Sequence, residues 1–212
     1  MNDRYLIGNA QTIGYREIQS NVFSTAYNDA GDLLAVLADG AIDHPNGRIS
    51  AIIAVRCCVN MFIQKFSSVD SAQANQFLLE TALAANKSIQ DSVYIGKSPR
   101  LSLTMALFRG KELHYFNVGV NKIFLNNRHN ERTLGAGANS TSSYGRCNLS
   151  PKDIVGILST GAHDRTHPME RIKIIESNLN INDKAQAIIV SVNKKGLTKQ
   201  LSATALLVEV AK

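Results

Sequence analysis

Short apolar runs separated by turn residues predict β-strands along most of the chain, and stretches with helical spacing of apolar positions interrupt them. We expect strands at Tyr5–Ile13, Val22–Tyr27, Leu33–Gly40, Leu101–Phe108, Leu113–Val118, Lys122–Leu125, Ile154–Leu158 and Leu201–Val210. We expect helices at Ile49–Phe66, Ser71–Gln90, Pro168–Leu179 and Asp183–Val192. Hairpin-connected strands and helices in consecutive pairs predict an α+β fold, with sheets packed together and helix pairs outside.

The apolar run Leu33–Gly40 ends abruptly in an acid and a glycine. We expect a buried strand that brings the carboxylate of Asp39 to the edge of a sheet, with Gly40 permitting a sharp turn. Together with the two strands before it, this run predicts that the first third of the chain is an antiparallel meander. Residues 126–151 are rich in Gly, Asn and Ser, which predicts a long, mobile surface connection.

Size and composition limit the class of protein. With 212 residues, 44% of them hydrophobic and 19% charged, the chain suits one globular domain, which we place at residues 1–212. No apolar run approaches the roughly 20 residues that span a bilayer, and Met1–Tyr5 lacks the plan of a signal peptide. We therefore expect a soluble cytoplasmic protein with no membrane partner. The net charge of +6 comes from scattered basic residues, which favours a solvated basic surface over a nucleic-acid site. Three cysteines without a CxxC spacing predict reduced thiols.

The loop after Asp39 carries residue types that bind metals or phosphate. Asp43 and His44 lie in it, and a long apolar helix pattern begins just after. A strand, an acidic turn and a buried helix in this order often frame a metal or phosphate site. An ordinary Asp-Gly turn explains the same residues, so both interpretations stand at this point.

Taken in order, six segments resemble the motifs of the PPM-type (type 2C) metal-dependent Ser/Thr protein phosphatases. Asp39-Gly40 with His44 and Gly47 is similar to the DGMGGHxxGE motif. Arg16 with Gln19-Ser20-Asn21 resembles the family's Arg followed by Asn-Glu-Asp, and Leu103-Thr104 resembles its LGTT strand. Asn117-Val118-Gly119 resembles the strand that leads into GDSR. Asp153 with Ile157-Leu158-Ser159 resembles D-x-LLLxSDG, and Ala203-Thr204 resembles DNxTxxVV. The resemblance covers nearly the whole chain. It implies a four-layer α/β/β/α sandwich of two mainly antiparallel sheets flanked by helix pairs, with the family's flap segment shortened.

The resemblance also implies a metal centre whose ligands this chain has mostly lost. In the family, two divalent cations held mainly by four aspartates are bridged by the attacking water. The four corresponding positions here are Asn21, Asp39, Thr160 and Leu201. Hard cations such as Mg²⁺ and Mn²⁺ bind through several anionic oxygens, so we expect no cofactor. Asp43 and Asp164 are the candidate substitute ligands, and Mn²⁺ or Mg²⁺ is expected only if they rebuild the site.

Two more residues match catalytic groups of the family and are vestigial candidates here. Arg16 matches an arginine that binds phosphate bidentately, which makes it the candidate phosphate-binding residue; a surface ion pair is the alternative. His44 matches a histidine that can act as an acid, yet without a metal-bound nucleophile it has little to protonate.

These departures predict a catalytically impaired phosphatase-like domain, a pseudophosphatase. We expect it to act by binding a protein partner: a phosphoprotein, a kinase or a phosphatase. One alternative is an active metal-dependent Ser/Thr protein phosphatase with a rearranged metal site. Another is a structural assembly subunit with a vestigial site.

Overall fold

The computed structural model describes residues 4–14, 17–40, 46–66, 70–92, 101–127, 130–136, 142–195 and 202–211. Its strands are β1 (Tyr5–Thr12), β2 (Asn21–Tyr27), β3 (Leu33–Gly40), β4 (Leu101–Arg109), β5 (Glu112–Val118), β6 (Lys122–Asn127), β7 (Asn130–Ala136), β8 (Ser142–Asn148), β9 (Ile154–Leu158) and β10 (Ala203–Val210). Its helices are α1 (Gly47–Lys65), α2 (Ala74–Gln90) with the preceding short 3-10 helix η2 (Ser71–Gln73), α3 (Thr160–His163), α4 (Pro168–Glu176) and α5 (Ile181–Lys194).

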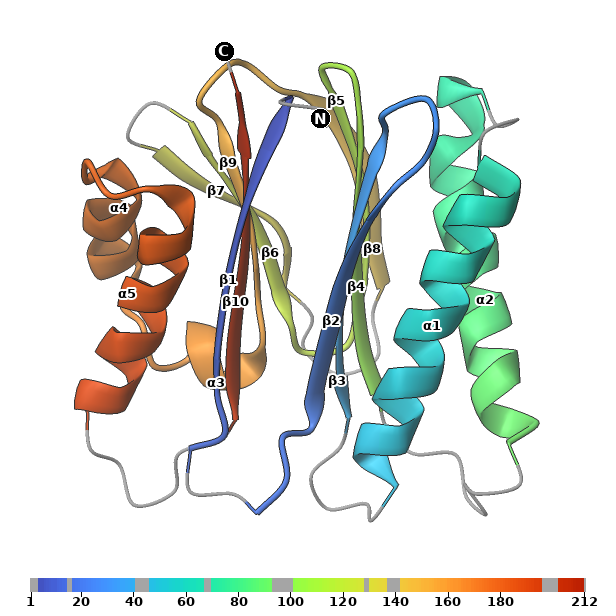
Figure 1. Ribbon diagram of the computed structural model, residues 1–212, viewed down its shortest axis with the longest axis horizontal. Coiled ribbons are helices and arrows are strands. Elements are labelled where there is room, and N and C mark those ends of the chain that lie inside the picture. The colour runs from blue at the N-terminus through green and yellow to red at the C-terminus, as the bar shows by residue number, and fades with distance from the viewer. Residues whose placement is uncertain are drawn as a thin grey trace.

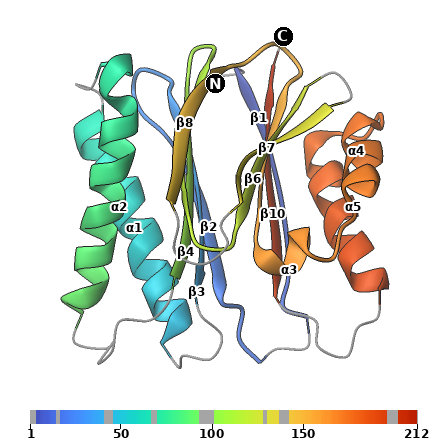
Figure 2. The ribbon, with the colours of Figure 1, turned by 180° about the vertical axis from the view of Figure 1, so that it is seen from behind.

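The strands form two antiparallel sheets that pack face to face (Figure 1). Sheet A has the order β1-β10-β9-β6-β7, and sheet B has the order β2-β3-β4-β5-β8. Helices α1 and α2 cover the outer face of sheet B, and α4 and α5 cover that of sheet A (Figures 1 and 2). The layers are therefore helices, sheet, sheet and helices.

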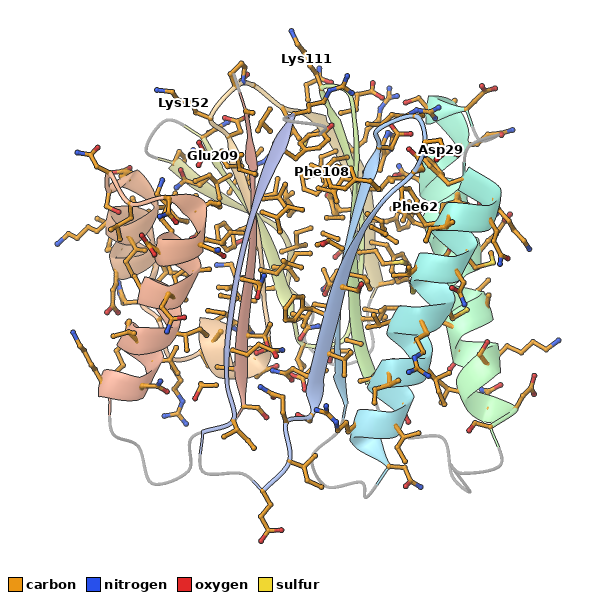
Figure 3. All side chains as sticks on the ribbon, in the orientation of Figure 1. Asp29, Phe62, Phe108, Lys111, Lys152 and Glu209 are labelled. Carbon is orange, nitrogen blue, oxygen red and sulfur yellow. The ribbon has the colours of Figure 1, made fainter. Side chains whose placement is uncertain are left out.

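Strand β3 lies inside the sandwich with both of its faces buried. Its side chains alternate between the cluster that fills the space between the sheets and the cluster under α1 and α2. A strand buried on both faces is apolar at every position, which explains the continuous run at Leu33–Ala38. Figure 3 shows the same two layers of the core, with Phe108 between the sheets and Phe62 between α1 and sheet B.

The prediction of an N-terminal meander is wrong for the first strand. Strands β2 and β3 form a hairpin, but β1 lies in the other sheet and pairs with β10, so that Tyr5 lies opposite Val210. A pairing between segments so far apart in sequence leaves no local turn signal. The pattern of residues near β1 could not reveal it.

The prediction of a long connection at residues 126–151 is also wrong, because this stretch contains β7 and β8. Strand β7 pairs with β6, and β8 pairs with β5 over all seven of its residues. Gly, Asn and Ser have low strand propensity, but pairing with a neighbouring strand overrides it. Strand β7 ends at Ala136 and β8 begins at Ser142, and residues 137–141 between them lie outside the described part of the chain.

The sharp turn expected after Gly40 falls on residues 41–45, outside the described residues, but Gly40 itself also has a packing role. Strand β3 continues through Gly40, which pairs with Leu101. A Cβ atom on Gly40 would lie 2.0 Å from the carbonyl oxygen of Gly47. Glycine is therefore needed because the first turn of α1 packs directly against the end of β3.

Helix α1 is, within the described ranges, the one helix with the length and hydropathy to cross a membrane, whereas the sequence pattern predicted no apolar run of that length. It packs against β2, β3 and α2, and most of its apolar residues belong to the cluster under the helices. Burial against sheet B accounts for these residues, whereas Ile49 and Ile63 are exposed.

Candidate functional site

Asp39 lies at the end of the sandwich where β2, β3 and β4 come together. Its neighbours across the sheet are Asn21 on β2 and Ser102 on β4. The backbone N–H of Gly40 donates a hydrogen bond of 3.4 Å to the carbonyl of Ser20, which holds the chain just before β2 against the end of β3. The prediction that a buried strand brings this carboxylate to the sheet's end is confirmed.

The carboxylate of Asp39 has weak polar compensation for its burial. Ser20 Oγ donates to Asp39 Oδ1 at 3.4 Å, and no ion pair joins Asp39 to a described residue. Burial raises the pKa of Asp39 from the ordinary 3.8 to about 6, and the Ser20 hydrogen bond opposes this rise. With no positive group beside it among the described residues, the buried carboxyl of Asp39 is held closer to its neutral form.

Asn21, which also matches a ligand position of the expected metal centre, makes hydrogen bonds that join the two sheets. Its amide Nδ2 donates to the Ser202 carbonyl at 3.3 Å and to Thr204 Oγ1 at 3.1 Å. Gln11 Nε2 on β1 also donates to Thr204 Oγ1, at 2.9 Å. The side chains of Ser20 and Ser202 lie 3.2 Å apart, within hydrogen-bonding distance.

We call this group the inter-sheet polar cluster; its members are Gln11, Ser20, Asn21, Asp39, Ser202 and Thr204. Asn21, Ser202 and Thr204 are each at most 2% exposed. Ser159 extends the cluster, because its Oγ accepts a hydrogen bond of 2.9 Å from the backbone N–H of Thr204. Apart from Asp39 all its side chains are neutral, and their amide donors are already satisfied by protein acceptors.

The donor set does not fit a pair of divalent cations. Asp39 supplies the one carboxylate of the cluster. Asn21 adds only a neutral amide, whose nitrogen donates to Ser202 and Thr204 and whose oxygen accepts from Ser20 Oγ at 3.5 Å. Among the described residues, no three His, Cys, Asp or Glu side chains are grouped closely enough to hold a metal ion. Two cations at the roughly 3.5–4 Å spacing of two-metal sites need more negative charge than this to offset their repulsion.

Thr160 and Asp164 lie at the start of α3 and just after it, next to the β5–β6 connection. Thr160 Oγ1 donates to the Val120 carbonyl at 3.4 Å. Asp164 is half exposed and pairs with His163, with 2.9 Å between Oδ1 and Nδ1. In the described part of the chain, no hydrogen bond or ion pair joins either residue to Asp39. Asp164 thus contacts His163 rather than Asp39.

The remaining predicted site residues cannot be placed. Arg16, Asp43, His44 and Leu201 all lie outside the described residues. Their roles as phosphate anchor, substitute ligand, vestigial acid and lost ligand therefore stay predictions.

Several polar residues of this region were missed by reading the motifs. Ser20, Ser202 and Thr204 contribute to the cluster, and Arg48, beside Gly47 on α1, donates a hydrogen bond to the carbonyl of Gln19. Ser202 directly follows Leu201, and this position next to a lost ligand is the feature of the sequence that could have identified it. Arg48 lies where the DGMGGHxxGE motif ends in a glutamate, and this reversal of charge is a second such feature.

Solved structures give independent evidence on the fold. The serine/threonine phosphatase of S. agalactiae superposes with a TM-score of 0.86 at 18% identity, covering 97% of this chain and 99% of that one. The serine/threonine phosphatase of Staphylococcus aureus superposes at 0.84 with 15% identity, covering 97% and 95%. This chain has the PPM-type Ser/Thr phosphatase fold. The expected α+β sandwich of two antiparallel sheets between helix pairs is confirmed.

The likeness extends to a PPM-type domain that was solved with metal. The catalytic domain of the phosphatase PstP in complex with two manganese ions superposes at a TM-score of 0.82, with 14% identity over 98% of this chain and 99% of that one. No protein-family model matches the sequence, and no curated protein matches it either. The PPM-type fold is thus shared over the whole chain while the sequence has diverged widely.

Proposed function

We propose that this domain is a pseudophosphatase that acts by binding a protein and has lost the hydrolytic chemistry of its fold. The observation that carries the proposal is the inter-sheet polar cluster. Where a metal centre needs converging carboxylates, the side chains around Asp39 are neutral and bind one another. A fold does not fix a function, and here the site argues against the chemistry that the fold supports elsewhere.

The partner expected for such a domain is a phosphoprotein, a kinase or a phosphatase in cytoplasmic signalling. Arg16 is the proposed anchor for a phosphate group, because a guanidinium pairs with phosphate oxygens bidentately. Binding without turnover sequesters a phosphorylated partner or competes with an active phosphatase for it.

Metal binding and turnover provide the first test. Calorimetric titration with Mn²⁺ and with Mg²⁺ should give no tight binding, and p-nitrophenyl phosphate should not be hydrolysed with either ion present. Robust metal-dependent hydrolysis that Asp39→Ala abolishes would overturn the proposal. It would support the alternative of an active enzyme with a metal site rebuilt from Asp39 and either Asp43 or Asp164.

Partner capture tests the phosphate anchor. Affinity purification should recover partners with the unmodified chain and lose them with Arg16→Ala. The matched control is Arg56→Ala, which removes an exposed arginine on α1 away from the cluster. Loss with both variants, or with neither, would contradict an anchor at Arg16. Retention with both would favour the alternative of an assembly subunit that binds through another surface.

A further inference from the structure

Strand β8 is an open edge of sheet B. It pairs with β5 on one side, and no strand in the described part of the chain pairs with its other side. Edge strands are usually guarded by charged side chains (lysine above all), by proline or by a bulge, since their unpaired backbone groups accept a further strand. The β8 segment carries one charged residue, Arg146, has neither lysine nor proline, and keeps its register with β5 without a shift. By contrast, the edge strand β7 of sheet A meets its neighbour β6 with a register shift.

On the outer face of β8, the face that it shares with α2, the side chains of residues 142, 144, 146 and 148 are exposed. Tyr144 lies beside Phe116, which is 4% exposed, yet Tyr144 itself is 66% exposed. Arg146 lies beside the buried His114 and makes no ion pair with a described residue. Figure 2 shows β8 at the near edge of sheet B, next to α2. The ring of Tyr144 and the guanidinium of Arg146 therefore lie on the same face of β8, because side chains two residues apart in a strand share a face.

The sequence of β8 is complementary to itself when it runs antiparallel about Gly145. In such a pairing, a residue that precedes Gly145 in one copy lies opposite the residue that follows Gly145 by the same number of positions in the other copy. Tyr144 of each copy then lies opposite Arg146 of the other, on the same outer face. Ser142 lies opposite Asn148, so the outer row contains two aromatic–cation pairs and two polar pairs.

We propose that two copies of this chain pair through β8 about a twofold axis at Gly145, which joins the two B sheets into one continuous sheet. A pairing centred on Arg146 would place the two guanidinium groups opposite each other and is repulsive. A shift by one residue would put the outer face of one copy beside the inner face of the other. This interface is separate from the cluster around Asp39, so a test of the dimer does not depend on the pseudophosphatase proposal.

The first test is the concentration dependence of the mass, measured by sedimentation equilibrium. A seven-residue edge buries less surface than a standard interface, so we expect a reversible rise from 23.1 kDa to twice that value with concentration. Tyr144→Lys sets a lysine against Arg146 of the other copy and should weaken association about tenfold or more, since both pairs become repulsive. Tyr144→Glu removes the same ring but supplies an acid to each arginine, and should preserve association.

A mixed cross-link tests the register. In a Cys57→Ser, Cys147→Ser background, chains with Ser142→Cys and chains with Asn148→Cys should form a disulfide with each other, and neither should do so alone. The two residues are opposite only when Gly145 is the centre. A mass of 23.1 kDa at the highest attainable concentration would overturn the proposal. Equal weakening by Tyr144→Lys and Tyr144→Glu, or cross-linking of either cysteine chain alone, would also overturn it. Circular dichroism of each variant shows that the fold is retained.

Discussion

Replacing Asp39 with asparagine distinguishes a structural carboxylate from a metal ligand. Burial raises the pKa of Asp39 from 3.8 to about 6, so the ionised form destabilises the folded state. The full difference corresponds to about 3 kcal/mol at neutral pH. Because Asp39 is only partly buried as a residue, solvent screening reduces this value, and we expect Asp39→Asn to stabilise the domain by about 1–2 kcal/mol at pH 7.5.

The pH dependence follows from the direction of the shift. A carboxyl whose pKa is raised on folding makes the folded state bind more protons than the unfolded state between the two values. The unmodified chain therefore gains stability from Asp39 as the pH falls from above 6 towards 3.8, whereas the asparagine variant does not. The difference between the two should be largest near pH 7.5 and close to zero at pH 4.

Urea unfolding at pH 4, 6 and 7.5 measures this difference, with Asp29→Asn as a matched control at an exposed carboxylate in the β2–β3 turn. The control should change stability by less than about 0.5 kcal/mol. Repeating the pH 7.5 series with Mn²⁺ tests the opposite role, since an ion at 100 times its Kd stabilises by about 2.7 kcal/mol. Stabilisation by Mn²⁺ that the unmodified chain shows and Asp39→Asn loses would refute the reasoning, as would a variant less stable than the unmodified chain at pH 7.5.

Three further substitutions test other parts of the fold by urea unfolding. Thr204→Val removes the acceptor shared by two side-chain amides of the inter-sheet polar cluster and should cost about 1–3 kcal/mol; an unchanged midpoint would show that the cluster contributes nothing. Glu131→Ala leaves the guanidinium of Arg171, which is 2% exposed, without its bidentate partner and should cost about 3–5 kcal/mol; a surface-like effect would contradict this. Gly40→Ala places a methyl group against the carbonyl of Gly47 and should cost about 1–3 kcal/mol, and a neutral result would mean that α1 can move away.

Local patterns in the sequence were enough to locate most of the sandwich. Strands buried on one or both faces, such as β3, and helices with a broad apolar face, such as α1, lie within a few residues of their predicted bounds. Strands β7 and β8 were missed because their residues carry little strand propensity and depend on pairing with β6 and β5. An element could be predicted when its own residues carried the pattern, and it was missed when its formation depended on the strand beside it.

The site shows the same division. The position of Asp39 at the end of a buried strand followed from the run of apolar residues before it. The hydrogen bonds of Asn21 to Ser202 and Thr204 join segments from opposite ends of the chain. No pattern within either segment specifies the other, so the loss of ligands could be predicted but the network that replaces them could not.

The pairing of β1 with β10 has a consequence for biosynthesis. Sheet B can begin to form early, because β2, β3, β4 and β5 pair in sequence order. Sheet A places β10 between β1 and β9, so its centre stays open until residues 203–210 have left the ribosome. Until then β1 and β9 each present an unpaired edge, and folding must wait for a contact that spans almost the whole chain. A nascent chain arrested before β10 is therefore the form of this protein most exposed to aggregation.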